Sequence, residues 1–129
     1  MKERSQKRIL VVCHDEDIRL ALRDRLLSMG FDVVMENNGR SALERISLEA
    51  ADCPIRGVLL DFRAHTIGGT PALREIRERH PDIPLVVMLA VSDKAQLHEA
   101  RELGVRTYLM KPFDNVQDWE RIYWIFSNA

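Results

Sequence analysis

Short apolar runs alternate along the chain with longer segments in which apolar residues recur about every 3.6 positions. The runs are rich in Val, Ile and Leu, which is typical of β-strands, and they occupy residues 8–13, 31–36, 57–62, 85–90 and 107–110. The helical period is carried by Ile18, Leu22, Leu26 and Met29; by Ala42, Leu43 and Ile46; by Leu73 and Ile76; by Leu97, Ala100 and Leu103; and by Val116, Trp119, Ile122, Tyr123 and Phe126. The pattern therefore predicts five strand–helix units in succession.

The predicted strands show almost no polar alternation, so we expect both faces of the sheet to be buried. Such strands form parallel sheets, with helices on each side connected by right-handed crossovers. Residues suited to helix ends agree with this pattern, since Asp15 and Asp93 are placed as N-caps and Gly30 and Gly104 follow predicted helices. The sequence predicts a doubly wound α/β domain.

Length and composition favour one domain over residues 1–129, with the basic residues 1–7 as a flexible lead-in. The 129 residues are 46% hydrophobic and 30% charged, and the net charge of -1 gives no basic field for a nucleic-acid backbone. No apolar run approaches the roughly 18–20 residues that span a bilayer, and the start is too short for a signal peptide. We therefore expect a cytoplasmic protein without direct contact to nucleic acid or membrane, and two reduced cysteines.

In doubly wound sheets, ligands bind beyond the carboxyl ends of the central strands. Cys13 and His14 follow the first strand there, Asp61 follows the third, Leu89 ends the fourth and Lys111 follows the fifth. These positions are the candidate site.

The same residues resemble the receiver domain of two-component response regulators, the CheY-like family, over essentially the whole chain. "VLLDF" is similar to the strand that ends in the phosphoacceptor aspartate, here Asp61, with Gly69 eight residues later. "TYLMKPF" is similar to the fifth strand with its aromatic switch residue, Tyr108, and its lysine and proline, Lys111 and Pro112. "NNGRSALERI" and "ARELGV" match the second and fourth helix regions. The resemblance implies a flavodoxin-like sheet in the order 2-1-3-4-5 with five helices, and a phosphorelay signalling module that is not an enzyme.

The chain departs from the receiver pattern at three positions. Receivers place two adjacent acids after the first strand to hold Mg²⁺, and here these positions are Cys13 and His14, whose thiol and imidazole are poor Mg²⁺ ligands. The hydroxyl that reads the phosphorylated state, at the end of the fourth strand, is replaced by Leu89. Asp15 is better explained as an N-cap than as a substitute acid. We expect no metal or cofactor, weak or absent Mg²⁺ binding, impaired phosphorylation, and an Asp61 that pairs with Lys111.

Two alternatives remain open at this point. One is a working receiver that accepts a phosphoryl group on Asp61 with an altered metal site. The other is a metal- or thiol-dependent sensor in which Cys13 and His14, with Asp61 and His65, hold a transition metal. Adjacent residues at a strand end point in opposite directions, which counts against it. A disulfide between Cys13 and Cys53 is not expected, because the two residues belong to opposite edges of the sheet.

The resemblance also implies a protein partner, such as a histidine kinase, an output domain or another signalling protein. In receivers the fourth and fifth helices with the fifth strand form the partner and homodimer surface. The last predicted helix carries more aromatic surface than one buried face can absorb, so we expect part of it to be exposed; the aromatic residues are Trp119, Tyr123, Trp124 and Phe126. Whether Trp124 binds a partner or lies flat on the surface stays open.

Overall fold

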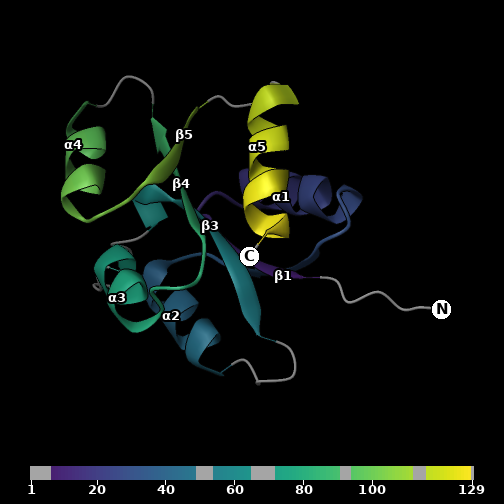
Figure 1. Cartoon of the computed structure of the whole chain (residues 1–129), viewed down its shortest axis with the longest axis horizontal. Helices are drawn as coiled ribbons and strands as arrows, with labels where there is room; N and C mark the ends of the chain where they lie inside the picture. Colours follow the sequence, from purple (N-terminus) through teal and green to yellow (C-terminus); the bar gives the residue numbers. More distant parts are fainter. Residues whose placement is uncertain (1–6, 49–53, 65–71, 91–93, 112–115, 129) are drawn as a thin grey trace.

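The computed structural model describes residues 7–48, 54–64, 72–90, 94–111 and 116–128. Strands and helices alternate, as the hydrophobic pattern predicts (Figure 1). The strands are β1 (Arg8–Val12), β2 (Asp32–Glu36), β3 (Ile55–Asp61), β4 (Leu85–Ala90) and β5 (Thr107–Lys111). The helices are α1 (Glu16–Ser28), α2 (Gly39–Leu48), α3 (Ala72–Arg79), α4 (Lys94–Glu102) and α5 (Val116–Ser127), with a 3₁₀ turn at Phe62–Ala64.

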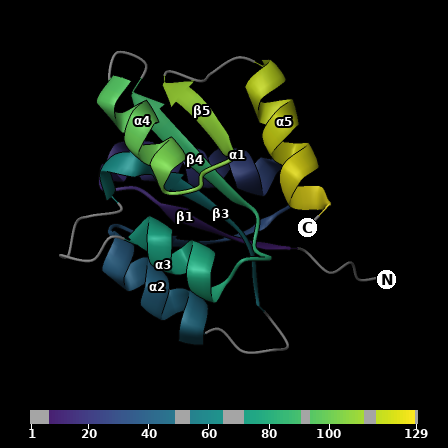
Figure 2. The same ribbon diagram turned by 60° about the vertical axis from the view of Figure 1, so that its left-hand side comes forward.

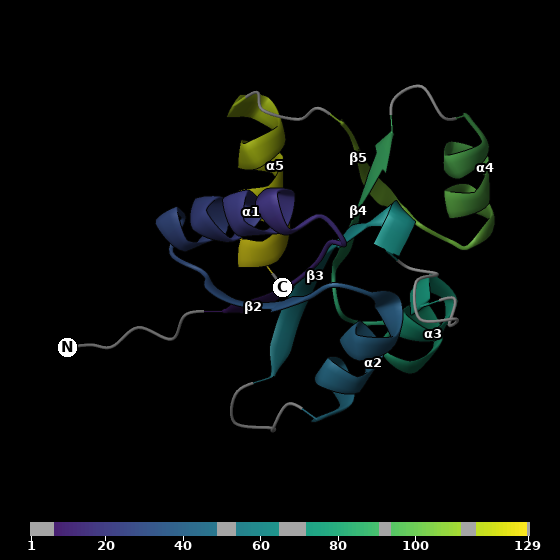
Figure 3. The same ribbon diagram turned by 180° about the vertical axis from the view of Figure 1, so that it is seen from behind.

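The five strands form one parallel sheet in the order β2-β1-β3-β4-β5, which confirms the predicted fold class and strand order. Helices α1 and α5 cover one face, and α2, α3 and α4 cover the other (Figures 2 and 3). Side chains alternate between the two layers along each central strand: Leu59 packs with α1 and α5, whereas Val58 and Leu60 pack with the opposite helices. The apolar runs of the central strands β1, β3 and β4 are therefore buried on both faces, whereas the edge strand β2 is only half-buried along its whole length, against the prediction.

Helix α5 lies against the sheet at a position where β3 has no side chain. A Cβ atom on Gly57 would lie 2.5 Å from Cδ1 of Phe126, which is closer than carbon atoms approach. Phe126 is fully buried and also meets Phe31 in an edge-on contact with ring centroids 6.1 Å apart. Gly57 thus makes room for the ring that fixes the end of α5.

The ends of α1 follow the predicted capping residues. Asp15 has an extended backbone, and its Oδ1 accepts a hydrogen bond from the Ile18 amide over 3.1 Å, which confirms the N-cap. Gly30 has φ of +95° directly after Met29, a conformation that favours glycine at a helix end. Asp93, the second predicted N-cap, lies outside the described residues.

Some positions of the helical apolar pattern are not buried. Ile18 is 41% exposed and lies in the first turn of α1, where it lines the same cavity as Asp61. Val116 is exposed in the first turn of α5, and Tyr123 is half exposed on the same helix. The period therefore predicts the helices correctly and overestimates the buried face, at the first turns of α1 and α5 and at Tyr123 in the second half of α5.

Lys7, assigned to the lead-in by composition, contacts two elements. Its carbonyl accepts a hydrogen bond from the Asp32 amide, and its Nζ donates to the Ser127 carbonyl at the end of α5. Residues 1–6 lie outside the described part of the chain. Within that described part, no helix is long and apolar enough to cross a membrane.

Candidate functional site

The predicted site residues end neighbouring strands at one edge of the sheet. Cys13 follows β1, and Asp61 is the last residue of β3, one position beyond the pair that joins Val12 to Leu60. Asp61 is in turn opposite Met88 in β4, and the backbone of Lys111 ends β5 opposite Ala90. The parallel sheet therefore brings residues from four separate parts of the sequence to one edge, as predicted.

Cys13 and Asp61 meet at the centre of this edge. The Cys13 side chain is 0% exposed and is present as a thiol, and Asp61 is 4% exposed. The Sγ atom lies 3.7 Å from Oδ2 of Asp61 and 3.6 Å from the Asp15 carbonyl oxygen, within reach of a weak S–H hydrogen bond to either acceptor. The other carboxylate oxygen, Oδ1, accepts a hydrogen bond from the Arg63 amide over 3.1 Å. Asp61 is thus a buried acid whose two oxygens face an amide and a thiol.

His14 takes the opposite direction from Cys13, as expected for adjacent residues at a strand end. It is exposed and lines a cavity of about 390 Å³ at the carboxyl edge of the sheet. The other lining residues are Asp15, Glu16, Asp17, Ile18, Asp61 and Arg63. The structure records no hydrogen bond or ion pair between the His14 ring and the Asp61 carboxylate within the described residues. This geometry does not favour a shared role for the thiol and the imidazole.

The loop after β1 is held by contacts that the sequence pattern did not indicate. Nη1 of Arg19 donates a hydrogen bond of 2.8 Å to the Cys13 carbonyl, and the Cys13 amide donates to the carbonyl of Glu36, the last residue of β2. Asp15, the first of three consecutive acids after His14, has Oδ1 engaged in capping α1. The position of Asp15 just before a helical pattern predicted its role as an N-cap. No comparable sequence rule predicts that Arg19 binds the Cys13 carbonyl.

The two predicted switch positions lie on β4 and β5. Leu89 lies in β4, is fully buried and pairs with Met110 of the neighbouring strand β5. Tyr108 lies two residues before Met110 in β5 and packs against the core cluster that contains Leu89. The Tyr108 hydroxyl accepts a hydrogen bond of 3.1 Å from Nη2 of Arg101 on α4. Arg101 was not among the predicted site residues, because its contact depends on how α4 packs beside β5.

Several predicted residues cannot be placed in this site. The Lys111 side chain lies outside what the structure describes, so its pairing with Asp61 stays a prediction. His65, Gly69, Cys53 and Pro112 also lie outside the described residues. Among the residues that are described, no three His, Cys, Asp or Glu side chains form a group that would hold a metal ion.

The side chain nearest Asp61 at the end of β1 is not of a type that Mg²⁺ favours. This ion takes oxygen ligands in near-ideal octahedral geometry, and thiols are soft ligands that suit other metals. The side chain that faces Asp61 from the end of β1 is a thiol, and the next acid in the sequence caps a helix.

Comparisons with known proteins agree with the fold. The model of the response regulator receiver domain family matches residues 9–122. Transcriptional regulatory protein ZraR of Escherichia coli (strain K12) is 37% identical over 111 residues, covering 84% of this chain and 24% of that protein. The probable transcriptional regulator ycf27 of Cyanophora paradoxa is 34% identical over 111 residues, covering 86% of this chain and 44% of that protein. The chain thus spans less than half the length of these curated relatives.

Solved structures show the same fold. The receiver domain of sensor histidine kinase PA1611 from Pseudomonas aeruginosa PAO1, which has a magnesium ion coordinated in its active site cleft, superposes with a TM-score of 0.80 at 22% identity, covering 97% of this chain and 100% of that one. NtrX from Brucella abortus superposes with a TM-score of 0.79 at 25% identity, covering 96% of this chain and 27% of that one. The chain belongs to the response regulator receiver domain family.

Proposed function

We propose that this receiver domain has impaired Mg²⁺-dependent phosphorylation at Asp61 and acts as a protein-interaction module in two-component signalling. The observation that supports this proposal is the buried Cys13 thiol, 3.7 Å from the Asp61 carboxylate, at the position where receivers have an acid.

The argument rests on charge. A carboxylate that attacks a phosphoryl donor brings two negative groups together, and a divalent ion offsets that repulsion. A neutral thiol and an outward-facing imidazole supply no hard oxygen ligand to hold the ion beside Asp61. Phosphoryl transfer to Asp61 is therefore slow in this chain.

The described switch positions support the same proposal. Leu89 has no hydroxyl that could bind a phosphoryl group on Asp61, and the Tyr108 hydroxyl is already bound to Arg101. A phosphoryl group at Asp61 would lack the usual connection between the site and the α4–β5 surface. The domain then presents one surface to its partner whatever its phosphorylation state.

The partner that we propose is another signalling protein, a histidine kinase or an output domain, and not nucleic acid. Receiver domains are signalling modules, and the curated relatives carry additional sequence beyond the matched segment. The face expected to bind includes α5, which exposes Tyr123 and Trp124. In this proposal the chain transmits a signal by contact and catalyses no reaction.

The test measures ion binding and phosphorylation directly. Amide chemical shifts of the unmodified chain should not change saturably at millimolar Mg²⁺, with or without beryllofluoride, and acetyl phosphate should leave Asp61 unlabelled. The double variant Cys13→Asp/His14→Asp supplies the two missing carboxylates and should gain both Mg²⁺-dependent shifts and labelling. Adding Asp61→Asn to that double variant is the matched control, and it should abolish labelling.

Two results would contradict the proposal. Saturable shifts around Asp61 in the unmodified chain would establish a working receiver with an altered metal site. Stoichiometric zinc in the purified protein, lost in Cys13→Ser, would establish the metal-dependent sensor instead.

A further inference from the structure

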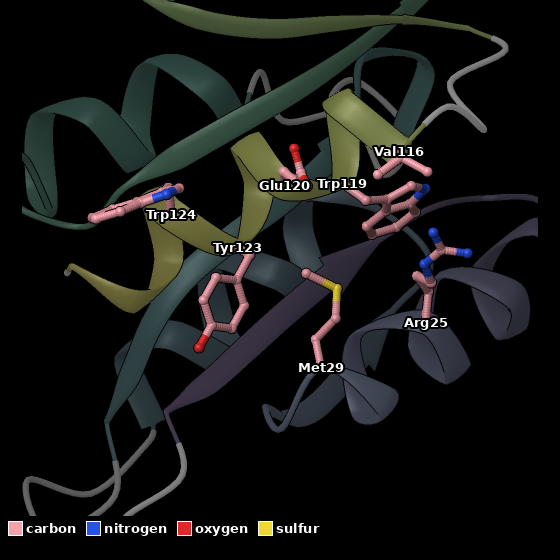
Figure 4. A pocket seen from close by; sticks show the side chains of 7 residues that line it. All are labelled: Arg25, Met29, Val116, Trp119, Glu120, Tyr123 and Trp124. Atoms are coloured by element: carbon pink, nitrogen blue, oxygen red, sulfur yellow. The ribbon is translucent and has the colours of Figure 1, made fainter.

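A groove of about 580 Å³ runs between the second half of α1 and the outer surface of α5 (Figure 4). Arg25 and Met29 form its α1 wall, and Val116, Glu120, Tyr123 and Trp124 belong to its α5 wall. This groove lies on the α1–α5 face of the sheet and contains none of the residues around Asp61. The proposed phosphoacceptor chemistry does not use it.

The α5 wall carries unusually large exposed apolar side chains. Trp124 is 68% exposed, Val116 is 64% exposed and Tyr123 is 47% exposed. Glu120 lies between Val116 and Trp124 at a spacing of four residues, so these three side chains form one stripe along the helix. Exposed aromatic residues grouped in this way are typical of protein interfaces.

One positive and one negative side chain accompany this apolar stripe. The Arg25 guanidinium lies 5.1 Å from the centroid of the Trp119 ring, on the α1 side of the groove, and Glu120 projects from α5 (Figure 4). Both side chains are exposed, and neither has an ion-pair partner within the described residues. A binding partner must therefore offer apolar side chains together with one acid for Arg25 and one base for Glu120.

A second copy of this chain meets that requirement completely. In a two-fold symmetric dimer, each contact between residues i and j occurs twice, so Arg25 of each protomer can face Glu120 of the other. The same rotation apposes the two Trp124–Val116 stripes and covers both grooves. We propose that the chain forms an isologous homodimer through α1 and α5.

This surface differs from the one that the family resemblance implied for a homodimer. Helix α4 presents mainly polar side chains to solvent, namely Lys94, His98, Glu99, Arg101 and Glu102. Those side chains provide no apolar centre for an interface, and aromatic residues and arginine are the side chains that most often dominate binding. The apolar surface is on α5, and the groove beside it opens toward α1.

Sedimentation of the unmodified chain at increasing concentration tests the dimer. We expect a reversible monomer–dimer equilibrium that Trp124→Ala weakens at least about tenfold. Arg25→Glu and Glu120→Arg each place like charges across the interface twice, and each should weaken the dimer by about tenfold or more. Arg121→Glu, on another face of α5, is the matched control and should leave the equilibrium unchanged.

Mixing the two charge-reversal variants makes the test specific for a trans contact. A heterodimer of Arg25→Glu with Glu120→Arg has opposite charges at both contacts, so the mixture should associate more tightly than either variant alone. Thermal melts of each variant check that the fold is retained. The proposal is overturned if the unmodified chain is monomeric up to about 0.5 mM, if the mixture fails to associate, or if Arg101→Glu on α4 disrupts the dimer while Glu120→Arg does not.

Discussion

The Cys13 thiol lies against the Asp61 carboxylate inside the carboxyl edge of the sheet, with Sγ 3.7 Å from Oδ2. Cys13 is a small, uncharged neighbour for a buried acid. The contact determines how the site responds to added or removed charge.

Cys13→Asp should destabilise the fold when divalent ions are chelated. The new carboxylate would be buried beside Asp61, and an uncompensated buried charge costs about 2–4 kcal/mol of unfolding free energy. Cys13→Asn, which has nearly the same shape without the charge, is the control. Denaturant midpoints in chelator should fall further for the Asp variant, and Mg²⁺ should raise only that midpoint because the ion binds the folded state. Equal midpoints for the two variants would show that charge does not control this position.

Asp61→Asn should also destabilise the domain, by about 1–2 kcal/mol. The ionised carboxylate accepts a charge-assisted hydrogen bond from the Arg63 amide, and a neutral amide accepts a weaker one. Lys111 ends β5 at the same edge and is the predicted ion-pair partner of Asp61. Asp24→Asn, on the exposed side of α1, is the control and should change the midpoint little. A higher denaturation midpoint for Asp61→Asn with an unchanged slope would contradict this account of the site.

Gly57→Ala should destabilise the domain by about 1–3 kcal/mol, although alanine ordinarily suits a strand better than glycine. The added Cβ would lie 2.5 Å from Cδ1 of Phe126 and force α5 away from β3. Phe126→Val removes the ring atoms that clash, so Gly57→Ala should cost much less in that background. A double-mutant cycle in denaturant measures this coupling, and additive effects would mean that the ring is not the obstacle.

Tyr108 should hold one orientation, whatever binds near Asp61. Its ring packs with the core cluster that contains Leu89, and its hydroxyl accepts a hydrogen bond from Arg101. Spectra of carbon-13-labelled tyrosine should show one Tyr108 environment with and without Mg²⁺ and beryllofluoride, and Arg101→Ala should broaden or shift that signal. Tyr123, on α5, is the internal control. Two populated Tyr108 environments in the unmodified chain would refute the prediction.

The hydrophobic pattern predicted the elements well, because burial on both faces leaves a long apolar signal in each central strand. It placed the ends of the strands less well. β3 begins at Ile55, two residues before the apolar run. The pattern missed this start because Arg56, which is exposed, interrupts the apolar residues there, at the point where the pairing with β1 shifts between Arg8 and Ile9. The backbone pairing of β3 with β1 thus starts before the apolar run, and a sequence pattern records side chains only.

The candidate site was predictable where it depends on strand ends. Cys13, Asp61 and the backbone of Lys111 come together because parallel strands end at one edge. The opposite directions of Cys13 and His14 also followed from strand geometry. The contacts of Arg19 with the Cys13 carbonyl and of Arg101 with Tyr108 were not predictable, because each depends on the rotamer of a long side chain and on how a helix packs.

The contact between Lys7 and the Ser127 carbonyl makes the topology of this domain nearly cyclic. Lys7 also accepts a hydrogen bond from Asp32, so the start of β1 and the end of α5 are neighbours at the amino edge of the sheet. A short peptide that joins residue 127 to residue 7 would close the backbone into a ring without displacing either element. The ring could then be opened at another loop, which gives a circularly permuted chain. The sheet, both helical layers and the pocket around Asp61 would stay as they are.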